Sequence, residues 1–446
     1  MRWRASDLAR ALAECGPVRV IGPDVDVDGA SFDSRDLVAG QMFVALVADR
    51  DGHDFAPGAV DAGAVACLVS RPLPDDVAQR TTQIVVSDTA AALMDAARWA
   101  RTRFPAGTMA IGITGSVGKT STKDLVAAAV SASRRTVANV RSYNNEQGLP
   151  VTILNAPVDT QVLVLEMGMR GFGQIDLLCR IARPAIGIVT RVGEAHTSMV
   201  GGLDGVARAK GELVEALPSF GAAVLNADDE RVLAMRSRTD ARVISYGEAA
   251  EADVRIDELN LGDDGAARFT ARTPDGSIEV ALAVPGRHMA SNAAAAIAAG
   301  VVLGVSLDAL AAGLAHASTS PHRMRIVRTR SGATVLDDSY NANPTSMSAA
   351  LETLARLPGR RRHAVLGLMA ELDDPVTSHR EIAGQARVLG VGVVAVGTDL
   401  YGVDASDVVD LDSAIARVAA LGDGDVVLVK GSRVAGLDRL VDAVAN

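Results

Sequence analysis

One stretch, "AIGITGSVGKTST" (110–122), restricts the fold of this chain more than any other segment. An apolar run, "AIGITG", leads directly into a turn that contains Gly115 and Gly118. Glycine allows the backbone to reverse there without steric cost. From Lys119 onward, "KTSTKDLVAAAVSA" has the composition of a helix. A strand, a tight glycine turn and a helix in this order predict a parallel α/β sheet around the segment.

The same turn has the chemistry of a phosphate loop, although its spacing is unusual. The common pattern is Gly, four residues, then Gly-Lys-Ser/Thr, and this chain has Ile113 where that first glycine would stand. Backbone N–H groups and a helix N-terminus still favour phosphate here. Lys119 supplies a point charge, and the Thr120 hydroxyl can bind Mg²⁺. We therefore predict a nucleoside triphosphate site made of Gly115, Ser116, Val117, Gly118, Lys119, Thr120 and Ser121. The loop alone leaves GTPase, kinase, motor ATPase and ligase open.

Alternating apolar strands and helices predict an α/β protein of three domains. Residues 1–87 mix short strands with Asp/Gly turns, as in a small α/β domain. Residues 88–320 contain the loop and continuous apolar strands, which indicate a parallel sheet covered on both faces, with antiparallel strands over 253–285. Residues 321–446 repeat the alternation and predict a Rossmann-like sheet. Its first strand lacks Gly-x-Gly-x-x-Gly, which argues against a nicotinamide site.

Composition narrows the class of partner. The net charge of −10 argues against nucleic acid as a partner. No apolar run approaches the roughly 20 residues of a membrane helix. Three scattered cysteines form neither a metal spacing nor a disulfide framework, which favours the reducing cytoplasm. Nothing in the sequence requires more than a monomer.

Three further residues are candidates for the chemistry behind the loop. Glu166 ends the strand "VLVLEM", where an acid can meet metal and phosphate, although a surface acid is the alternative. His196 follows the next strand, and a solvated or core histidine is its ordinary interpretation. Lys210 lies on the following helix, where lysines are usually solvated. The chain has only four lysines, however, which suggests positions where a guanidinium cannot replace an amine.

Together these motifs resemble the ATP-dependent Mur ligases of peptidoglycan synthesis, in the branch that adds D-Ala-D-Ala. The similarity runs nearly end to end, and "DDSYNANP" (337–344) is its most type-specific element. The other matching segments are "SFDSRDLVAGQMFVAL", "DGHDF", "TGSVGKTSTK", "SYNNEQGLPVTIL", "LEMGMRGFGQI", "AHTSMVGGLDGVARAKGEL", "LNADDE", "PGRHMASNAAAA", "PHRM" and "LVKGSR".

The resemblance implies a reaction and the residues that carry out catalysis and binding. ATP would phosphorylate the terminal carboxylate of UDP-N-acetylmuramoyl-tripeptide, and the amine of D-Ala-D-Ala would attack the acyl phosphate. Lys119, Glu166, His196 and Lys210 would be catalytic. Thr120 and Glu166 would bind one Mg²⁺, and His196 with a carbamylated Lys210 a second. The implied ATP contacts beyond the loop are Asn292, Arg323 and Asp338. The implied substrate contacts are Ser34, Arg35, Asn144, Asn145, Tyr340, Asn341, Asn343, Lys430, Ser432 and Arg433.

The resemblance also sets limits. Leu368 stands where the family pattern has Asp, which affects a contact of the third domain. A hinge near Pro321 would let that domain close on ATP. Two alternatives remain open: a ligase of the same superfamily with another acceptor (polyglutamate, folyl or cyanophycin type), and a P-loop regulatory ATPase without ligase activity.

Overall fold

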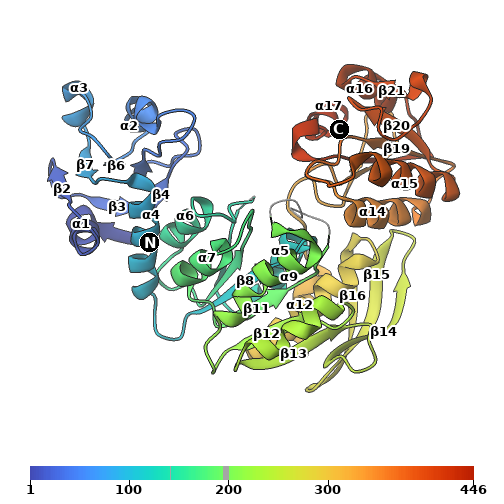
Figure 1. Ribbon diagram of the computed structural model, residues 1–446, viewed down its shortest axis with the longest axis horizontal. Helices are drawn as coiled ribbons and strands as arrows, with labels where there is room; N and C mark the ends of the chain where they lie inside the picture. The colour runs from blue at the N-terminus through green and yellow to red at the C-terminus, as the bar shows by residue number, and fades with distance from the viewer. Residues whose placement is uncertain (141, 194–199, 446) are drawn as a thin grey trace. The chain divides into compact units, whose positions relative to one another are not determined.

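The computed structural model describes residues 1–140, 142–193 and 200–445 (Figure 1). The chain divides into two compact units. The first contains Met1–Gly112, Arg134–Met169 and Gly173–Ile186, and the second contains Ile113–Ser133, Arg170–Phe172 and Gly187–Asn446. Among the residues described, no helix is both long enough and apolar enough to cross a bilayer.

The N-terminal part of the first unit is a small α/β domain, as predicted. Its five-stranded sheet has the order β2-β7-β6-β5-β4, with β4 to β7 parallel and β2 antiparallel to β7. The buried strand "ACLV" packs with its neighbours against helix α2. The elements are β1 (Arg2–Arg4), α1 (Ala5–Ala13), β2 (Arg19–Ile21), β3 (Asp26–Asp28), β4 (Ala30–Ser31), β5 (Met42–Val44), α2 (Ala56–Asp61), β6 (Ala66–Val69), α3 (Asp75–Ala78) and β7 (Thr82–Val85).

A nine-stranded sheet follows, in the order β16-β15-β14-β13-β12-β11-β8-β10-β9. The pairs β9–β10, β12–β13 and β13–β14 are parallel, and β14, β15 and β16 are antiparallel, which confirms the expectation for 253–285. Its strands are β8 (Met109–Thr114), β9 (Thr136–Ala138), β10 (Val162–Glu166), β11 (Ile186–Val189), β12 (Ala222–Asn226), β13 (Arg242–Gly247), β14 (Val254–Leu261), β15 (Ala266–Thr273) and β16 (Gly276–Pro285).

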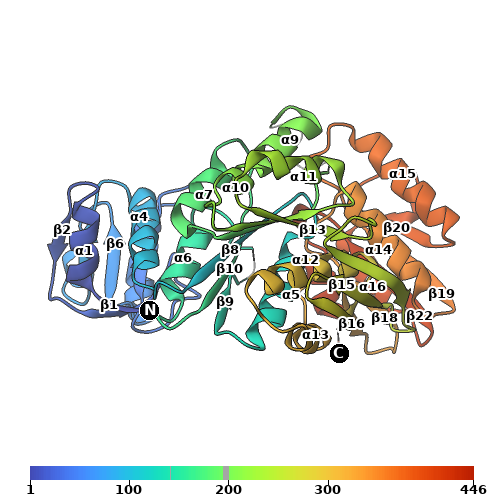
Figure 2. The ribbon, with the colours of Figure 1, turned by 90° about the horizontal axis from the view of Figure 1, so that it is seen from below.

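The helices of this region position the loop studied below. Asp88 caps the first of them by accepting from the N–H groups of Ala90 and Ala91 at 2.8 and 3.0 Å. The helix that follows the glycine turn packs on two Ala-rich helices of the same unit, α12 and α13 (Figure 2). The helices are α4 (Thr89–Thr102), α5 (Lys119–Ser131), α6 (Gly148–Asn155), α7 (Gln174–Ala182), α9 (Gly202–Lys210), α10 (Glu212–Glu215), α11 (Glu230–Leu233), α12 (His288–Val302) and α13 (Leu307–Ala315).

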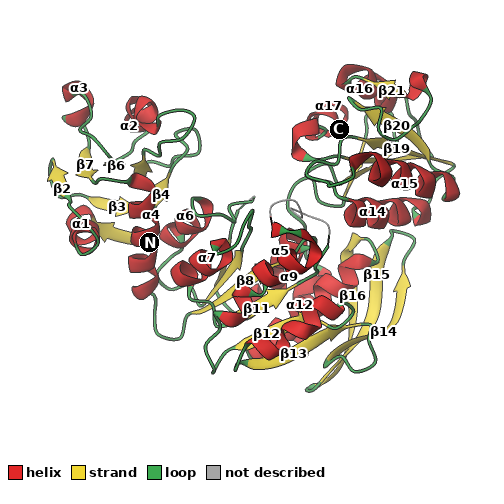
Figure 3. Cartoon of the chain, in the orientation of Figure 1, coloured by secondary structure: helices red, strands yellow, loops and turns green. Residues whose placement is uncertain are grey.

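The C-terminal part is a three-layer α/β domain with helices on both faces of its sheet (Figure 3). The strand order is β17-β18-β22-β19-β20-β21, and only β17 runs antiparallel to its neighbour. The elements are β17 (Arg325–Arg328), β18 (Thr334–Asp337), α14 (Pro344–Arg356), β19 (Arg361–Leu366), α15 (Pro375–Val388), β20 (Gly392–Val396), β21 (Val408–Val409), α16 (Leu411–Ala419), β22 (Asp425–Lys430) and α17 (Asp438–Val444).

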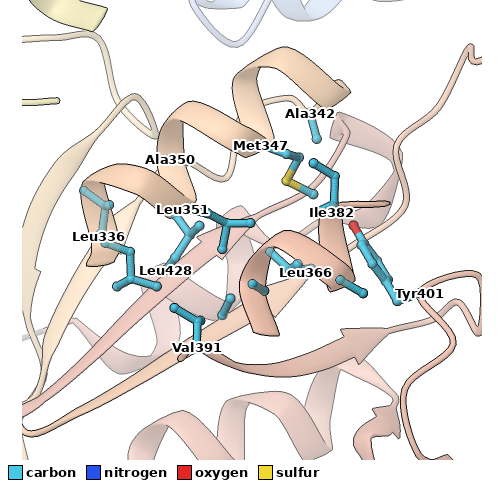
Figure 4. Close-up of a cluster of buried hydrophobic side chains, with 14 of the residues drawn as sticks. Leu336, Ala342, Met347, Ala350, Leu351, Leu366, Ile382, Val391, Tyr401 and Leu428 are labelled. Carbon is cyan, nitrogen blue, oxygen red and sulfur yellow. The ribbon is translucent and has the colours of Figure 1, made fainter. Parts of the chain in front are cut away.

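Alternate residues of these strands fill two cores. Leu336, Leu366 and Leu428 pack under α14 and α15 (Figure 4). Their neighbours along the strands, such as Val335 and Val427, pack under α16 and α17. A strand that is buried on both faces has a continuous run of apolar residues in the sequence. These strands could therefore be predicted from the sequence.

The end of one helix has a clear local cause. Helix α12 starts at His288 and stops before Gly304. Gly304 has φ 67°, the left-handed conformation in which helices commonly end.

Candidate functional site

The turn between β8 and α5 can be formed only with glycine at its first position. Gly115 has φ 150° and Gly118 has φ 83°. A Cβ at position 115 would lie 1.9 Å from the Thr190 hydroxyl oxygen. Gly118 is the N-cap of α5, so the helix begins at Lys119 and its first N–H groups face the turn. This is the strand–turn–helix geometry predicted for the phosphate loop.

Hydrogen bonds to the chain after β11 hold the loop in shape. The Ser116 N–H donates to the Arg191 carbonyl at 2.7 Å. The Ser116 hydroxyl donates to the Gly193 carbonyl and accepts from the Gly193 N–H, both at 2.9 Å. The Thr190 hydroxyl donates to the Val117 carbonyl at 2.6 Å. The loop is therefore preorganised by protein contacts alone.

Two side chains at the start of α5, those of Lys119 and Thr120, lie close to the loop. The Lys119 ammonium donates to the carbonyls of Gly115 at 2.7 Å and Ser116 at 3.3 Å. The Thr120 side chain is buried, and its hydroxyl oxygen lies 3.5 Å from a guanidinium nitrogen of Arg323. Ser121, the last predicted loop residue, is half-buried. The Lys119 ammonium and the Thr120 hydroxyl therefore lie where the outer phosphates of a nucleotide and a metal ion would bind.

Asn292, predicted to contact ATP, lies beside the loop. Its amide oxygen accepts from the Thr122 hydroxyl at 3.2 Å and would be 2.8 Å from a Cβ at Gly118. The amide nitrogen is directed to the Met289 sulfur at 3.5 Å. The side chain is therefore held next to the start of α5.

Lys210 is the last residue of α9 and is only 2% exposed. The solvated interpretation is therefore wrong. Burial lowers the pKa of its amine well below the ordinary value, and the positive charge of Lys119 lowers it further. A neutral lysine amine is a nucleophile rather than a fixed cation.

Glu166, in the first unit, is the last residue of β10 and is also buried, so the surface-acid interpretation is wrong. Asn144 donates its amide to one carboxylate oxygen at 2.7 Å. Asn139 accepts from the Glu166 N–H at 2.7 Å and donates to its carbonyl at 3.3 Å. These two asparagines fix both the strand end and its carboxylate.

In the C-terminal domain, Asp338 and Lys430 form a buried ion pair. The Lys430 ammonium also donates to the Asn341 carbonyl at 2.9 Å. Burial lowers the pKa of Lys430, and the nearby Asp338 opposes that shift. Both predicted side chains therefore have a partner within the domain itself.

Two other predicted residues, Arg323 and Arg433, lie against the ring of a third, Tyr340. The Arg323 guanidinium carbon is 4.3 Å from the Tyr340 ring centroid, and that of Arg433 is 5.7 Å away on the same ring. The exposed Asn341 is adjacent in sequence. Cation–π contacts of this kind orient an arginine without removing its hydrogen-bond donors.

Some predicted substrate residues have structural partners. The Asn145 side-chain oxygen accepts from the N–H of Gly148, the first residue of α6, at 2.9 Å. Asn343 caps α14 and forms a capping box with Ser346. The Ser432 hydroxyl accepts from the Ala370 N–H at 2.9 Å and donates to the Ala342 carbonyl at 3.2 Å.

Ser34 and Arg35, predicted for the uridine-diphosphate region, follow β4 in the first unit. Arg35 is 85% exposed and pairs with Asp33 at 2.6 Å.

His196 lies outside the described residues. Leu368, at the position where Asp was expected, accepts from the Ser432 N–H through its carbonyl at 2.8 Å. That backbone contact does not depend on the side chain.

His288 was missed by the sequence analysis. It is the first residue of α12, and burial lowers the pKa of its imidazole. The charge of Asp338 opposes this lowering of the pKa, and the charge of Lys430 adds to it. The histidine in "PGRHMASN" was visible in the sequence. Nothing in the sequence pattern linked it to Asp338 and Lys430, which lie 50 and 142 positions later.

Comparisons with known proteins agree along the whole chain. Residues 113–300 match the model of the Mur ligase middle domain, and residues 322–433 match that of the Mur ligase, glutamate ligase domain. The UDP-N-acetylmuramoyl-tripeptide--D-alanyl-D-alanine ligase of Mycobacterium tuberculosis is 40% identical, with 93% of this chain and 91% of that protein aligned. The enzyme of that name from Escherichia coli is 37% identical, with 95% of each chain aligned.

Solved structures show the same architecture. MurF from Acinetobacter baumannii aligns with a TM-score of 0.85 at 29% identity, over 99% of this chain and 98% of that one. MurF ligase from Thermotoga maritima, in complex with ADP, aligns with a TM-score of 0.79 at 27% identity, over 94% of this chain and 97% of that one.

Replacing Gly115 with Ala tests the loop directly. Strain of about 1–3 kcal/mol at this backbone, with the clash against Thr190, should weaken ATP binding roughly tenfold or more. Isothermal titration calorimetry measures the change. Gly107→Ala is the matched control, because nothing lies within 4 Å of its added Cβ. Unchanged affinity in Gly115→Ala would refute the assignment of the loop.

Proposed function

The chain belongs to the Mur ligase family, and we infer that it is an ATP-dependent ligase that joins D-Ala-D-Ala to UDP-N-acetylmuramoyl-tripeptide. The observation that carries this conclusion is the match to ligases of that name over 93% and 95% of this chain. The two family models together span the phosphate loop, the buried Lys210 and the "DDSYNANP" segment. The reaction belongs to the synthesis of peptidoglycan precursors.

The chemistry explains why a phosphate loop is needed. A carboxylate is a poor electrophile until one of its oxygens becomes part of a phosphate leaving group. The terminal carboxylate of the tripeptide attacks the γ-phosphorus of ATP, which gives an acyl phosphate and ADP. The neutral amine of D-Ala-D-Ala then adds to the acyl carbon, and the tetrahedral intermediate expels phosphate and forms the amide. The protein contributes mainly positioning and charge stabilisation.

The residues of the loop fit that task. Lys119 and the N–H groups at the start of α5 bind the outer phosphates, and Arg323 approaches from the linker before β17. Thr120 and Glu166 offer the hard oxygen ligands that Mg²⁺ prefers. When bound, Mg²⁺ neutralises phosphate charge. No group of three His, Cys, Asp or Glu side chains suited to a metal occurs within 1–140, 142–193 and 200–445, although Mg²⁺ bound through phosphates usually needs only one or two carboxylates.

The remaining assignments are proposals. We propose that Asn292 and Asp338 contact the nucleotide, and that His196 assists a second Mg²⁺. Ser34 and Arg35 would bind the uridine-diphosphate part of the substrate. The residues proposed for the peptide and the incoming amine are Asn144, Asn145, Tyr340, Asn341, Asn343, Lys430, Ser432 and Arg433. We also propose domains over 1–87, 88–320 and 321–446, a monomer, and a cytoplasmic location that suits three free cysteines.

We further propose that Lys210 is carbamylated. Its lowered pKa leaves the amine neutral at pH values where an ordinary lysine is protonated. The neutral amine can add to CO₂ and release one proton, which gives an anionic oxygen ligand. A guanidinium would not react in this way, which accounts for a lysine in a chain with 40 arginines among its 44 basic residues.

The ligase assignment is tested by measuring phosphate release with ATP, Mg²⁺, UDP-N-acetylmuramoyl-tripeptide and D-Ala-D-Ala. Release should require both the tripeptide and the dipeptide. Replacing D-Ala-D-Ala with glutamate should abolish it. Equal turnover with glutamate would support a ligase with another acceptor, and turnover without any carboxylate substrate would support a regulatory ATPase.

Lys210→Ala should lower kcat on the order of a hundredfold, as loss of a metal-site ligand does. Short carboxylates such as acetate should restore part of the activity. Arg236→Ala, an exposed charge in the same unit, is the control. An independent readout is a ¹³C NMR carbamate signal from ¹³C-bicarbonate in the wild type, absent in Lys210→Ala. An identical signal in both proteins would contradict carbamylation of this residue.

A further inference from the structure

The five residues 320–324 that precede β17 are held at alternate positions by three aspartates. The first of these contacts is at Ser320. Its N–H donates to one carboxylate oxygen of Asp124 at 2.6 Å, and its hydroxyl donates to the other at 3.0 Å. Asp124 lies on α5, the helix that begins at the phosphate loop. The start of the linker is therefore attached to the loop's own helix.

A buried lysine supports this first contact. The Lys123 ammonium is 3.0 Å from the Asp124 carboxylate and 3.4 Å from the Ser320 hydroxyl. Its side chain is only 3% exposed. A charge in such a place needs a partner, so Lys123 and Asp124 stabilise one another while Asp124 holds the linker.

The second contact is at His322. Its Nδ1 is 3.1 Å from an Asp337 carboxylate oxygen and 3.3 Å from the Ser339 hydroxyl. That hydroxyl donates to the other Asp337 oxygen at 2.7 Å. Asp337 is 1% exposed and ends β18. The third contact is the Met324 N–H, which donates to Asp338 at 3.3 Å.

The backbone between these contacts adopts an unfavourable conformation. His322 has φ 62° and Met324 has φ 50°, and neither is glycine. Residues with a side chain occupy this region only where their surroundings hold them there. Arg323 lies between the two, with its guanidinium 3.5 Å from the Thr120 hydroxyl and 4.3 Å from the Tyr340 ring centroid.

We propose that Asp124 and Asp337 are positioning residues that fix the linker so that Arg323 is presented to the phosphate loop. They act through Arg323 and not by touching the nucleotide. The proposal rests on the ATP-dependent reaction inferred above. It also implies that any rotation of the C-terminal domain takes place outside the held segment 320–324, and not at Pro321 as expected from the sequence.

A double-mutant cycle separates this role from general stability, because only residues that act through one another are non-additive. Asp337→Asn keeps the shape and removes the charge that faces His322. It should lower kcat/KM for ATP about tenfold, the effect of one charge-assisted hydrogen bond. The KM for D-Ala-D-Ala should stay within about twofold, because Arg323 faces the nucleotide loop. Arg325→Ala, an exposed arginine of the next strand, should behave as wild type.

The decisive comparison is made in the Arg323→Ala background. There, Asp337→Asn should cause no further loss, either in kcat/KM or in the affinity for a non-hydrolysable ATP analogue measured by calorimetry. Independent, multiplying losses would overturn the proposal, and so would a wild-type kcat/KM in Asp337→Asn. If Asp337→Asn does not fold, Ser339→Ala removes the hydroxyl that bridges His322 and Asp337 while the direct contact between them remains, and its cycle with Arg323→Ala decides. If the wild type needs no D-Ala-D-Ala, the proposed function fails instead, while the calorimetric cycle still tests the positioning.

Discussion

The close approach of the phosphate loop to the chain after β11 is the constraint on which the site depends. Thr190 leaves no space for a side chain at Gly115, and its hydroxyl bonds the Val117 carbonyl. Ser116 adds a reciprocal pair of bonds with Gly193. A loop fixed in this way presents its N–H groups without reorganisation when phosphate arrives. The shifted glycine, which departs from the common spacing, is thus the more tightly packed of the two loop glycines.

The distribution of lysine follows from the same need for defined charges. Lys123, Lys210 and Lys430 are buried, and Lys119 bonds the carbonyls of the loop. Arginine supplies the remaining basic residues. Two of the buried amines, Lys210 and Lys430, have a lowered pKa because burial penalises the charged form. In this chain lysine occurs where a compact or neutralisable amine is useful, and the solvated surface is left to guanidinium groups.

The sequence predicted the α/β class, the buried strands and the loop, because each depends on local periodicity or on glycine at fixed spacing. It could not show that Glu166 and Lys210 are buried, since burial is decided by segments distant in the chain. It also could not distinguish Asn144, which bonds Glu166, from Asn145, which accepts from the N–H of Gly148 at the start of α6. The bonds from Ser320 to Asp124 and from His322 to Asp337 span 196 and 15 positions, and no pattern in the sequence marks either.

The central claim is that this site uses ATP to activate a carboxylate. The most direct test supplies UDP-N-acetylmuramoyl-tripeptide labelled with ¹⁸O in its terminal carboxylate, with ATP and D-Ala-D-Ala, and measures the released phosphate by mass spectrometry. Because the acyl-phosphate route breaks a bond between the acyl carbon and that oxygen, one ¹⁸O atom should appear in each phosphate. Phosphate without ¹⁸O, released while the amide forms, would contradict the account.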